Sequence, residues 1–432
     1  MLNRIVIVGG GAGGLELACR LGRKLGPQQV TLIDANPFHV WKPSLHEVAA
    51  GTLDIHQEGL SYSMLAHDNG FTFVFGAMTA LDRGARQVVV SETRAADGMV
   101  ILPQRSIDYD LLVLAVGSES NYFGVAGAAE HTLSLNGPAD AEWFRLRMLK
   151  LLTLANTDKA QDPQAGVQVV IIGGGATGVE LAAELREASE VHGRYGYPRL
   201  DPRQDVRITL LEGAPRILAP LPERVSHKAT QLLAERRVTV RTQCQVTRIE
   251  ADRVTDADGQ VYPADLIVWA AGIKAPAWLT TLGLPQGKNG QLRVDRRLRV
   301  EGCQDIMALG DCAACEYADG KWVPPRAQSA HQQADYLARV LLARQQGRAE
   351  PADSYVYRDY GSLVSMGTQT SVGSLMGNLF GATWFVEGLL ARCMYVSLHL
   401  LHHRAVLGAP RTALLALARF LVKRTRPLVK LH

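Results

Sequence analysis

Two glycine-rich turns are the residues whose spacing most clearly predicts chemistry. The pattern Gly-x-Gly-x-x-Gly occurs twice, at Gly9, Gly11 and Gly14 and at Gly173, Gly175 and Gly178. Each turn lies between a run of β-branched residues and a helix-forming run, the context in which this pattern has meaning. The first glycine permits a tight turn, the second lets the backbone approach a pyrophosphate, and the third lets the helix pack against the strand. The phosphates then lie at a helix N-terminus, whose dipole favours anions.

An acidic residue ends the strand expected after each turn. Residues 30–34 end in Asp34, and residues 207–212 end in Glu212. A carboxylate at this point accepts a hydrogen bond from a ribose 2′-hydroxyl and repels a 2′-phosphate, so the second turn is expected to prefer NADH over NADPH. The alternative is an ordinary carboxylate at a strand end. A polar insertion, about residues 190–205, lengthens the second connection.

Three further apolar runs are expected to be buried parallel strands. They are residues 111–117, 266–272 and 306–311. Their C-terminal ends, at Gly117, Gly272 and Gly310, should reach the ligand crevice of an α/β protein. The chain is expected to contain a first dinucleotide fold, an inserted second one, a return to the first and a C-terminal domain. The expected boundaries are 1–120, 160–285, 290–350 and 356–432.

Composition excludes several classes of protein. With 432 residues, 47% hydrophobic and 20% charged, the chain is expected to be globular with two to three domains. Six scattered cysteines argue against a disulfide framework and favour a reducing compartment. The N-terminus matches neither a signal nor a transit peptide. No uncharged apolar run reaches 18 residues, so no membrane-spanning helix is expected.

The C-terminal part is strongly basic. From residue 360 onward there are eight Lys and Arg against one Glu, a net charge of +7 in a chain whose total is +4. A helix from Pro410 to about Thr425 would carry apolar and basic side chains on opposite faces, which is typical of a helix lying in a bilayer interface. The expected faces are Leu414, Leu417 and Leu421 against Arg419, Lys423 and Arg426. The alternative is a helix packed on the body or on a partner subunit.

A preceding segment, residues 384–403, is also apolar, and its Trp384, Phe385 and Tyr395 would suit an interface. Nucleic acid is not the expected partner, because no aromatic residues are interleaved with the basic ones. The histidines of this segment have helical spacing but too few companions for a metal site, so none is expected. They are His399, His402 and His403.

Two glycine-rich folds, two strands that end at glycine and a late Gly-Asp resemble the flavoproteins of the glutathione-reductase type. This resemblance implies two Rossmann-like domains, the first binding FAD and the second, inserted one binding the pyridine nucleotide. It assigns Asp34 to FAD, Glu212 to NADH and Asp311 to the ribityl chain of FAD. Residues 38–47 lack the redox cysteine pair of the disulfide reductases. Cys312 and Cys315 are expected to be small buried residues, with a redox or metal role as the alternative.

A more specific resemblance is to the type II NADH:quinone oxidoreductases. The resemblance extends over essentially the whole chain and is carried by several short motifs. They are residues 41–47, 269–276, 327–333, 360–364, 372–379 and 426–432. The spacing at Asp256 and Asp258 is too short for a Ca²⁺ loop, which disfavours the Ca²⁺-regulated branch. The resemblance implies a homodimer on anionic phospholipid at the cytoplasmic face of a bacterial inner membrane.

The same resemblance implies the reaction. NADH bound to the second fold would pass hydride from C4 to N5 of a non-covalent FAD, and the flavin would then reduce membrane quinone by two electrons without proton pumping, feeding a respiratory chain. It places Lys42 against the flavin N5 edge and Glu180, in the first turn of its helix, at the nicotinamide–flavin junction. The alternatives are a surface lysine and an acid favoured by the helix dipole.

The residues of the 327–333 motif also have an interpretation of their own. A helix that opens at Pro-Pro and Ala327 would aim its N-terminus at the flavin and stabilise an anionic reduced state. Gln328 can bind a quinone carbonyl, and Gln332 lies one turn further on the same face. A solvated helix face suits Gln333 and does not suit Gln328. His331 is a proton donor or, alternatively, a hydrogen-bonded structural residue.

Three other functions stay open. An NADH oxidase or a reductase of a soluble acceptor would not need the basic C-terminal helix. A sulfide:quinone oxidoreductase would need a cysteine pair at the flavin, and the isolated Cys244, Cys303 and Cys393 do not supply one. A flavoprotein acting as a sensor would be reduced by NADH without turning over any quinone.

Overall fold

The computed structural model describes residues 3–95, 97–367, 371–376, 383–422 and 429. Parts of three expected features therefore lie outside the described residues. They are the motif residues 377–379, the basic residues Lys423 and Arg426, and the closing motif apart from Val429.

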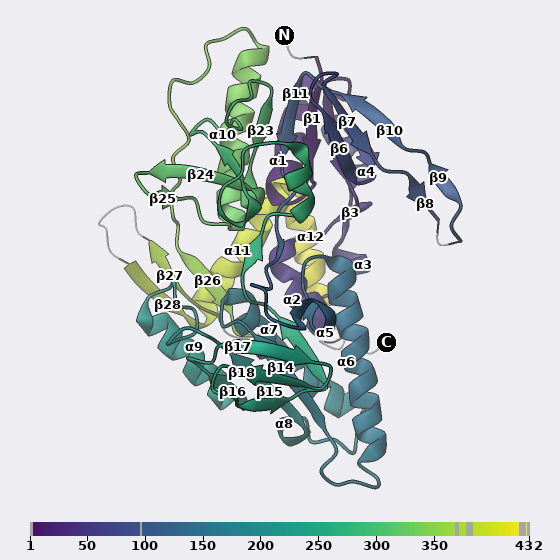
Figure 1. Ribbon diagram of the computed structural model, residues 1–432, viewed down its shortest axis with the longest axis vertical. Helices are drawn as coiled ribbons and strands as arrows, with labels where there is room; N and C mark the ends of the chain where they lie inside the picture. The colour runs from purple at the N-terminus through teal and green to yellow at the C-terminus, as the bar shows by residue number, and fades with distance from the viewer. Residues whose placement is uncertain (1–2, 96, 368–370, 377–382, 423–428, 430–432) are drawn as a thin grey trace.

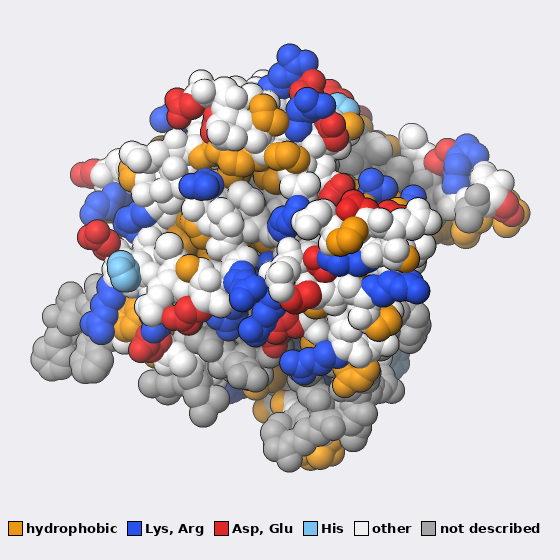
Figure 2. Space-filling model, turned by 90° about the horizontal axis from the view of Figure 1, so that it is seen from below, with side chains coloured by type: hydrophobic (Ala, Val, Ile, Leu, Met, Phe, Trp, Pro, Cys, Tyr) orange, Lys and Arg blue, Asp and Glu red, His pale blue; other side chains and the backbone are white. Residues whose placement is uncertain are grey.

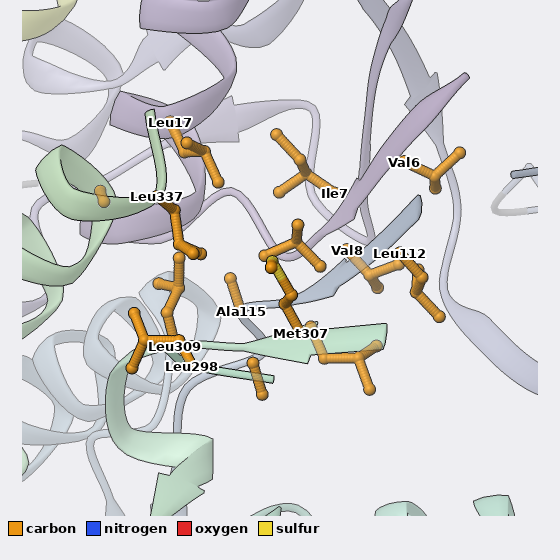
Figure 3. Packing of buried hydrophobic residues seen from close by; sticks show 14 of the residues in the cluster. Val6, Ile7, Val8, Leu17, Leu112, Ala115, Leu298, Met307, Leu309 and Leu337 are labelled. Atoms are coloured by element: carbon orange, nitrogen blue, oxygen red, sulfur yellow. The ribbon is translucent and has the colours of Figure 1, made fainter. Parts of the chain in front are cut away.

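The first glycine-rich turn belongs to a parallel sheet of five strands, which lies in the upper half of Figure 1. In spatial order the strands are β23 (Ile306–Ala308), β11 (Leu111–Leu114), β1 (Ile5–Val8), β2 (Val30–Asp34) and β5 (Thr72–Phe75). Helices α1 (Ala12–Leu25) and α10 (Ala327–Gln345) pack against it. Side chains of both helices meet those of the central strands in a buried hydrophobic core (Figure 3). The continuous apolar runs of β1 and β11 are explained by burial on both faces of the sheet.

The second turn belongs to another parallel sheet of five strands, lower in Figure 1. Its order is β13 (Leu133–Ser134), β20 (Leu266–Trp269), β14 (Val167–Ile172), β15 (Val206–Leu211) and β16 (Val238–Arg241). The helix that follows the turn is α7 (Ala176–Tyr195), and the polar insertion forms its last turns together with α8 (Pro202–Asp205). The sheet is also covered by α6 (Pro138–Asp158) and α9 (Glu223–Glu235).

Smaller elements join and flank the two sheets. The antiparallel strands are β6 (Met78–Asp82), β7 (Gln87–Val90), β10 (Arg105–Asp108), β17 (Val246–Glu250), β18 (Arg253–Asp256), β19 (Val261–Pro263), β3 (Phe38–His39), β4 (Leu60–Ser61), β8 (Thr93–Arg94) and β9 (Val100–Leu102). Strand β12 (Glu119–Ser120) pairs with β21 (Ile273–Lys274), which ties the end of β11 to the end of β20. The group β22 (Leu292–Val294), β24 (Ala313–Ala318) and β25 (Lys321–Trp322) leads towards α10. The short helices are α2 (Leu45–Ala50), α3 (Ile55–Glu58), α4 (Tyr62–Asn69) and α5 (Ala128–His131).

The C-terminal part crosses between the two sheets. An antiparallel group, β26 (Ser362–Ser365), β27 (Ser371–Met376) and β28 (Thr383–Glu387), is followed by α11 (Gly388–Leu407) and α12 (Ala409–Val422). Figure 1 shows these two helices, in yellow, between the first sheet above and the second sheet below. Within the described residues, no helix is both long and apolar enough to cross a membrane.

The surface seen from below is of mixed charge. Figure 2 shows Lys and Arg side chains interspersed with Asp and Glu across this face. Mixed signs of this kind are typical of a solvated surface.

Arg186 fixes α7, the helix of the second turn. Its guanidinium donates to the carbonyl oxygens of Pro202 at 2.5 Å, Val206 at 2.7 Å and Arg237 at 3.2 Å, and the residue is only 1% exposed. Replacing it with Met should lower the free energy of unfolding by about 3 kcal/mol, because buried carbonyls lose a charged donor. Urea unfolding followed by circular dichroism measures the change. Arg203→Met removes only an exposed pair with Glu190 and should change little; equal losses in both variants would contradict this account.

Candidate active site

The three glycines of each turn meet three different environments. A Cβ added to Gly9 or to Gly173 would collide with the backbone of the neighbouring strand end, and both residues have a positive φ. A Cβ on Gly14 or Gly178 would overlap the carbonyl oxygen of the first glycine of its own turn. The middle glycines, Gly11 and Gly175, face open space instead. Both turns therefore form a cradle in which backbone N–H groups can approach a pyrophosphate, and neither following helix is capped by a side chain.

The two strand-end acids hold their turns in the same way. Asp34 accepts hydrogen bonds from the backbone N–H of Gly10 at 2.6 Å and of Asn36 at 2.7 Å. Glu212 accepts from Gly174 at 2.6 Å and Ala214 at 2.7 Å. Each carboxylate is therefore fixed at the edge of its cradle. Carboxylate oxygens accept more than one bond, so both can also receive ribose hydroxyls.

Three residues predicted for the first cofactor converge from three segments of the chain. Lys42 donates to the carbonyl oxygen of Ser118 at 2.8 Å, and the Ser118 hydroxyl donates to Asp311 at 2.8 Å. Burial lowers the pKa of Lys42, while Asp311 and Asp140 act in the opposite direction. Gly117, at φ +71°, directly precedes Ser118 and faces open space. Lys42, Gly117 and Asp311 are thus brought together beside the first cradle.

Gln333 corrects one prediction. A solvated position was expected, but Gln333 is 1% exposed and its side-chain oxygen accepts the N–H of Gly310 at 2.7 Å. The helix turns this residue inward because α10 packs on the first sheet. Helix α10 begins at Ala327 with Arg326 at its N-cap, so the two prolines precede the helix instead of opening it.

Three predicted catalytic side chains bind the backbone of one segment, residues 358–365. Gln332 donates to the oxygen of Arg358 at 2.8 Å and accepts from its N–H at 3.0 Å. Gln328 donates to Gly361 at 3.0 Å and accepts from Tyr360 at 3.2 Å. In the described conformation both glutamine amides are therefore engaged on this segment, and their predicted contact with quinone stays a prediction.

The third side chain comes from the other fold. Glu180, on α7, accepts the N–H of Ser365 at 2.9 Å at the far end of the same segment. Glu180 is the fifth residue of α7, so it lies just after the first turn, in which it was expected. The segment 358–365 thus connects the helices of both dinucleotide folds.

Glu180 and Glu184 are buried acids that can bind and release protons near neutral pH. Burial raises the pKa of Glu180 to about 7, despite His46, whose Nδ1 lies 3.6 Å away. One turn along α7, burial and the nearby Glu47 raise the pKa of Glu184 to about 7, and the Thr52 hydroxyl donates to it at 2.5 Å. A carboxyl whose pKa lies near the working pH is suited to giving and taking protons.

Other predicted residues lie elsewhere. Gly272, at φ +65°, lies under the ring of Phe123, where a Cβ would collide, so it fixes the β12–β21 crossing and faces no open cradle. Burial raises the pKa of both Cys312 and Cys315 to about 12, which favours the small buried interpretation of the pair. Nδ1 of His331 lies 2.6 Å from a carboxylate oxygen of Glu16, which favours the interpretation as a hydrogen-bonded structural residue.

Several site residues escaped the sequence analysis. Glu184 lies four residues after Glu180 on one helix face, a spacing that could have revealed it. His46 belongs to the motif of residues 41–47, but no role was predicted for it. Ser365 acts through its backbone N–H, and Ser118 through its backbone carbonyl as well as its hydroxyl; no sequence signal marks such backbone contacts.

The acid group makes stability depend on pH with a definite sign. Because the folded pKa of Glu184 is raised from 4.5 to about 7, its ionisation destabilises the fold as pH rises through this range. Glu184→Gln, which keeps an acceptor for Thr52, should therefore stabilise the protein by up to about 3 kcal/mol more at pH 8 than at pH 5. Urea unfolding at both pH values measures this difference. Glu190→Gln, on the exposed side of α7, is the control, and a pH-independent effect of Glu184→Gln would overturn the assignment.

Comparisons with known proteins agree with this geometry. The family model of pyridine nucleotide-disulphide oxidoreductases matches residues 3–334. The type II NADH:quinone oxidoreductase of Haemophilus influenzae is 37% identical, with 100% of both chains covered, and the demethylphylloquinone reductase NdbB of Synechocystis is 31% identical over 87% of each chain. The structure of NDH2 from Plasmodium falciparum in complex with NADH shares the fold at a TM-score of 0.82 and 18% identity, covering 100% and 99% of the two chains. The chain therefore belongs to the pyridine nucleotide-disulphide oxidoreductases and, within them, to the type II NADH:quinone oxidoreductase family.

Proposed function

We propose that this protein oxidises NADH and reduces a membrane quinone by two electrons, using FAD bound to the first fold, and that it feeds a respiratory chain without pumping protons. The observation that carries the proposal is the presence of two open cradles, at Gly11 and Gly175, each with a carboxylate fixed at its edge. The names of the curated relatives support quinone as the acceptor. When bound, FAD supplies the hydride acceptor and the two-electron donor.

Each fold has a defined task in this proposal. Residues 1–120 and 290–350 hold FAD, with Asp34 on the ribose and Asp311 on the ribityl chain. Residues 160–285 hold NADH, with Glu212 on the ribose. Residues 356–432 provide membrane association and quinone access.

Quinone access is assigned to the segment 358–365. Gln328 and Gln332 hold its first half against α10, and Tyr360 is 51% exposed there. A quinone carbonyl only accepts hydrogen bonds, so it would bind the side-chain nitrogen of Gln328, which has a second N–H besides the one that donates to Gly361. Glu180, at the other end, can release a proton near neutral pH, and quinone reduction consumes two.

Membrane association is assigned to the outer side of α12. Leu414, Leu417 and Leu421 are 68%, 55% and 56% exposed, an apolar row of the kind that enters a bilayer interface. Of the expected basic face, Lys423 and Arg426 lie outside the described residues, and Arg419 points to the body, where it pairs with Glu58; Arg411, earlier on the same helix, pairs with Asp68.

In the preceding segment, residues 384–403, two of the aromatic residues expected at a membrane interface have neighbours within the protein. Phe385 lies under the guanidinium of Arg224, 4.5 Å from the ring centroid. Burial and the nearby Glu180 raise the pKa of Tyr395. The homodimer, the anionic lipid partner and the cytoplasmic face of a bacterial inner membrane are part of the proposal by family membership.

Stopped-flow absorbance tests the reaction. The purified protein is mixed anaerobically with NADH or NADPH and then with a short-chain quinone. We expect the flavin band to bleach much faster with NADH and to return with quinone. Return only with oxygen or a soluble dye would favour a reductase of a soluble acceptor, and no return with any quinone would favour a sensor.

Two matched variants test the assignment of the two carboxylates. Glu212→Gln keeps the acceptor for Gly174 but removes the charge that repels a 2′-phosphate, so the ratio of reduction rates with NADH and NADPH should fall about tenfold. Asp34→Asn should instead weaken FAD retention and leave that ratio unchanged. An unchanged ratio in Glu212→Gln would show that this carboxylate does not select the nucleotide.

Sedimentation with anionic phospholipid vesicles tests the membrane face. Replacing Leu414 and Leu417 together with Glu should lower the bound fraction at least about tenfold, since each exposed apolar side chain contributes to insertion. Raising the salt to about 0.5 M should have a smaller effect, because salt screens the attraction between charges and leaves the apolar contact of the leucines intact, and Arg411 and Arg419 are already paired. Trp322→Glu, at an exposed apolar residue on β25, is the control. The assignment would be contradicted if high salt abolished vesicle binding while the variant with both leucines replaced still bound.

A further inference from the structure

We propose that His39, His402 and Glu16 form a buried latch that shares one proton and docks the C-terminal helix α11 onto the first glycine-rich turn, so that the helix next to the membrane face helps to retain FAD. The part concerning FAD rests on the proposed function. The shared proton is a property of the protein alone.

The latch is a continuous row of hydrogen bonds through three elements. His39, on β3, lies with Nδ1 2.9 Å from the carbonyl oxygen of Gly10 and with Nε2 2.9 Å from Nε2 of His402. Nδ1 of His402, on α11, lies 2.8 Å from a carboxylate oxygen of Glu16 on α1. The three side chains are 4%, 2% and 1% exposed, so water does not replace these bonds.

The chemistry of the end groups fixes where the protons are. The Gly10 carbonyl can only accept, so Nδ1 of His39 must carry its hydrogen and Nε2 of a neutral His39 must accept. His402 must then donate from Nε2. Because a carboxylate also only accepts, His402 must donate from Nδ1 as well, which makes its ring a cation paired with Glu16. While His39 is neutral, all three bonds therefore exist only if His402 and Glu16 together hold one proton more than a neutral imidazole and a carboxylate do.

The surroundings favour this distribution of charge. Burial raises the pKa of Glu16, but the hydrogen bonds from His331 and His402 outweigh it and bring the pKa to about 2. Burial and the charge on His402 hold the pKa of His39 well below its usual value. Other charged or titratable groups face the pair from α1, α10 and α11. They are Arg20, His331, Asp335, His399 and His403.

The second turn shows what is special about the first. There the carbonyl of Gly174, the counterpart of Gly10, accepts a backbone N–H from Leu218 at 2.7 Å. In the first turn the Gly10 carbonyl is held by side chains, His39 and the hydroxyl of Tyr62 at 2.7 Å. The first turn is therefore linked to α11 through His39 and His402, whereas the second is held within its own fold.

The latch also reaches the residues beside the cofactor. The ring of Trp41 packs on His402 with centroids 4.4 Å apart, and the next residue, Lys42, binds Ser118. The same helix exposes Leu398 and Leu401, at 48% and 50%, close to His402 in sequence. A displacement of α11 would therefore move both the Gly10 turn and the Lys42 segment.

The first experiment locates the proton. Holoenzyme labelled with ¹⁵N-histidine is studied by NMR at pH 7, with His402→Gln to assign the signals. We expect both nitrogens of His402 to show the shifts of protonated nitrogen, and His39 to carry its proton on Nδ1 alone. A His402 ring with a single proton at pH 7 would overturn the proposal, whether or not flavin is bound.

The second experiment measures release of FAD by the rise of flavin fluorescence. His402→Gln and Glu16→Gln should each speed release about tenfold, and the double variant little more, because both break one latch. In the wild type, release should become faster as pH rises and the shared proton is lost; in His402→Gln this dependence should disappear. Arg404→Gln, an exposed charge change on the same helix, should release FAD like the wild type.

The affinity for NADH separates the latch from general damage, because the second turn does not contact it. Unchanged NADH binding with faster FAD release supports the latch. Additive effects of the two variants, or release that is unchanged in folded variants, would overturn it. A wild-type protein that binds no FAD would contradict the proposed function instead, and the NMR experiment would still test the shared proton.

Discussion

The close approach of a helix to a strand at the two glycine-rich turns is the constraint on which the remaining structure depends. A single added carbon at Gly14 or Gly178 would overlap the carbonyl oxygen of Gly9 or Gly173. Because no side chain stands between them, each helix starts at the cradle and the acid of the next strand reaches the N–H of Gly10 or Gly174. The same approach fixes α1, which carries the buried carboxylate that α11 binds.

Buried ionisable groups then join the separate folds. Burying a charge is unfavourable unless it is paired or hydrogen-bonded, so each such group specifies its neighbours closely. Glu180 requires the N–H of Ser365, and Glu16 requires two histidines from distant parts of the chain. The segment 358–365 and helix α11 are held in this way between two parallel sheets that share no strand.

The sequence predicted what is local and missed what depends on contacts across the fold. The strands and turns were predictable because apolar runs ending at glycine have few other structures available. The strand-end acids followed from their distance to the turns. Gln333 was placed wrongly because helical periodicity tells which residues share a face, and not which face another element covers. The inward direction of Arg419 depends on Glu58, and the pairing of Glu16 with His402 joins residues 386 positions apart.

Gln328 and Gln332 of α10 bind backbone atoms of Arg358, Tyr360 and Gly361. The identity of the side chains in this segment is therefore free to change without loss of these bonds, whereas neither glutamine can be exchanged for a residue lacking both a donor and an acceptor. Selection on the acceptor molecule can act on exposed positions such as Tyr360 while the helix stays constant. Within one family, divergence should thus accumulate in this short stretch and leave the helix that holds it unchanged.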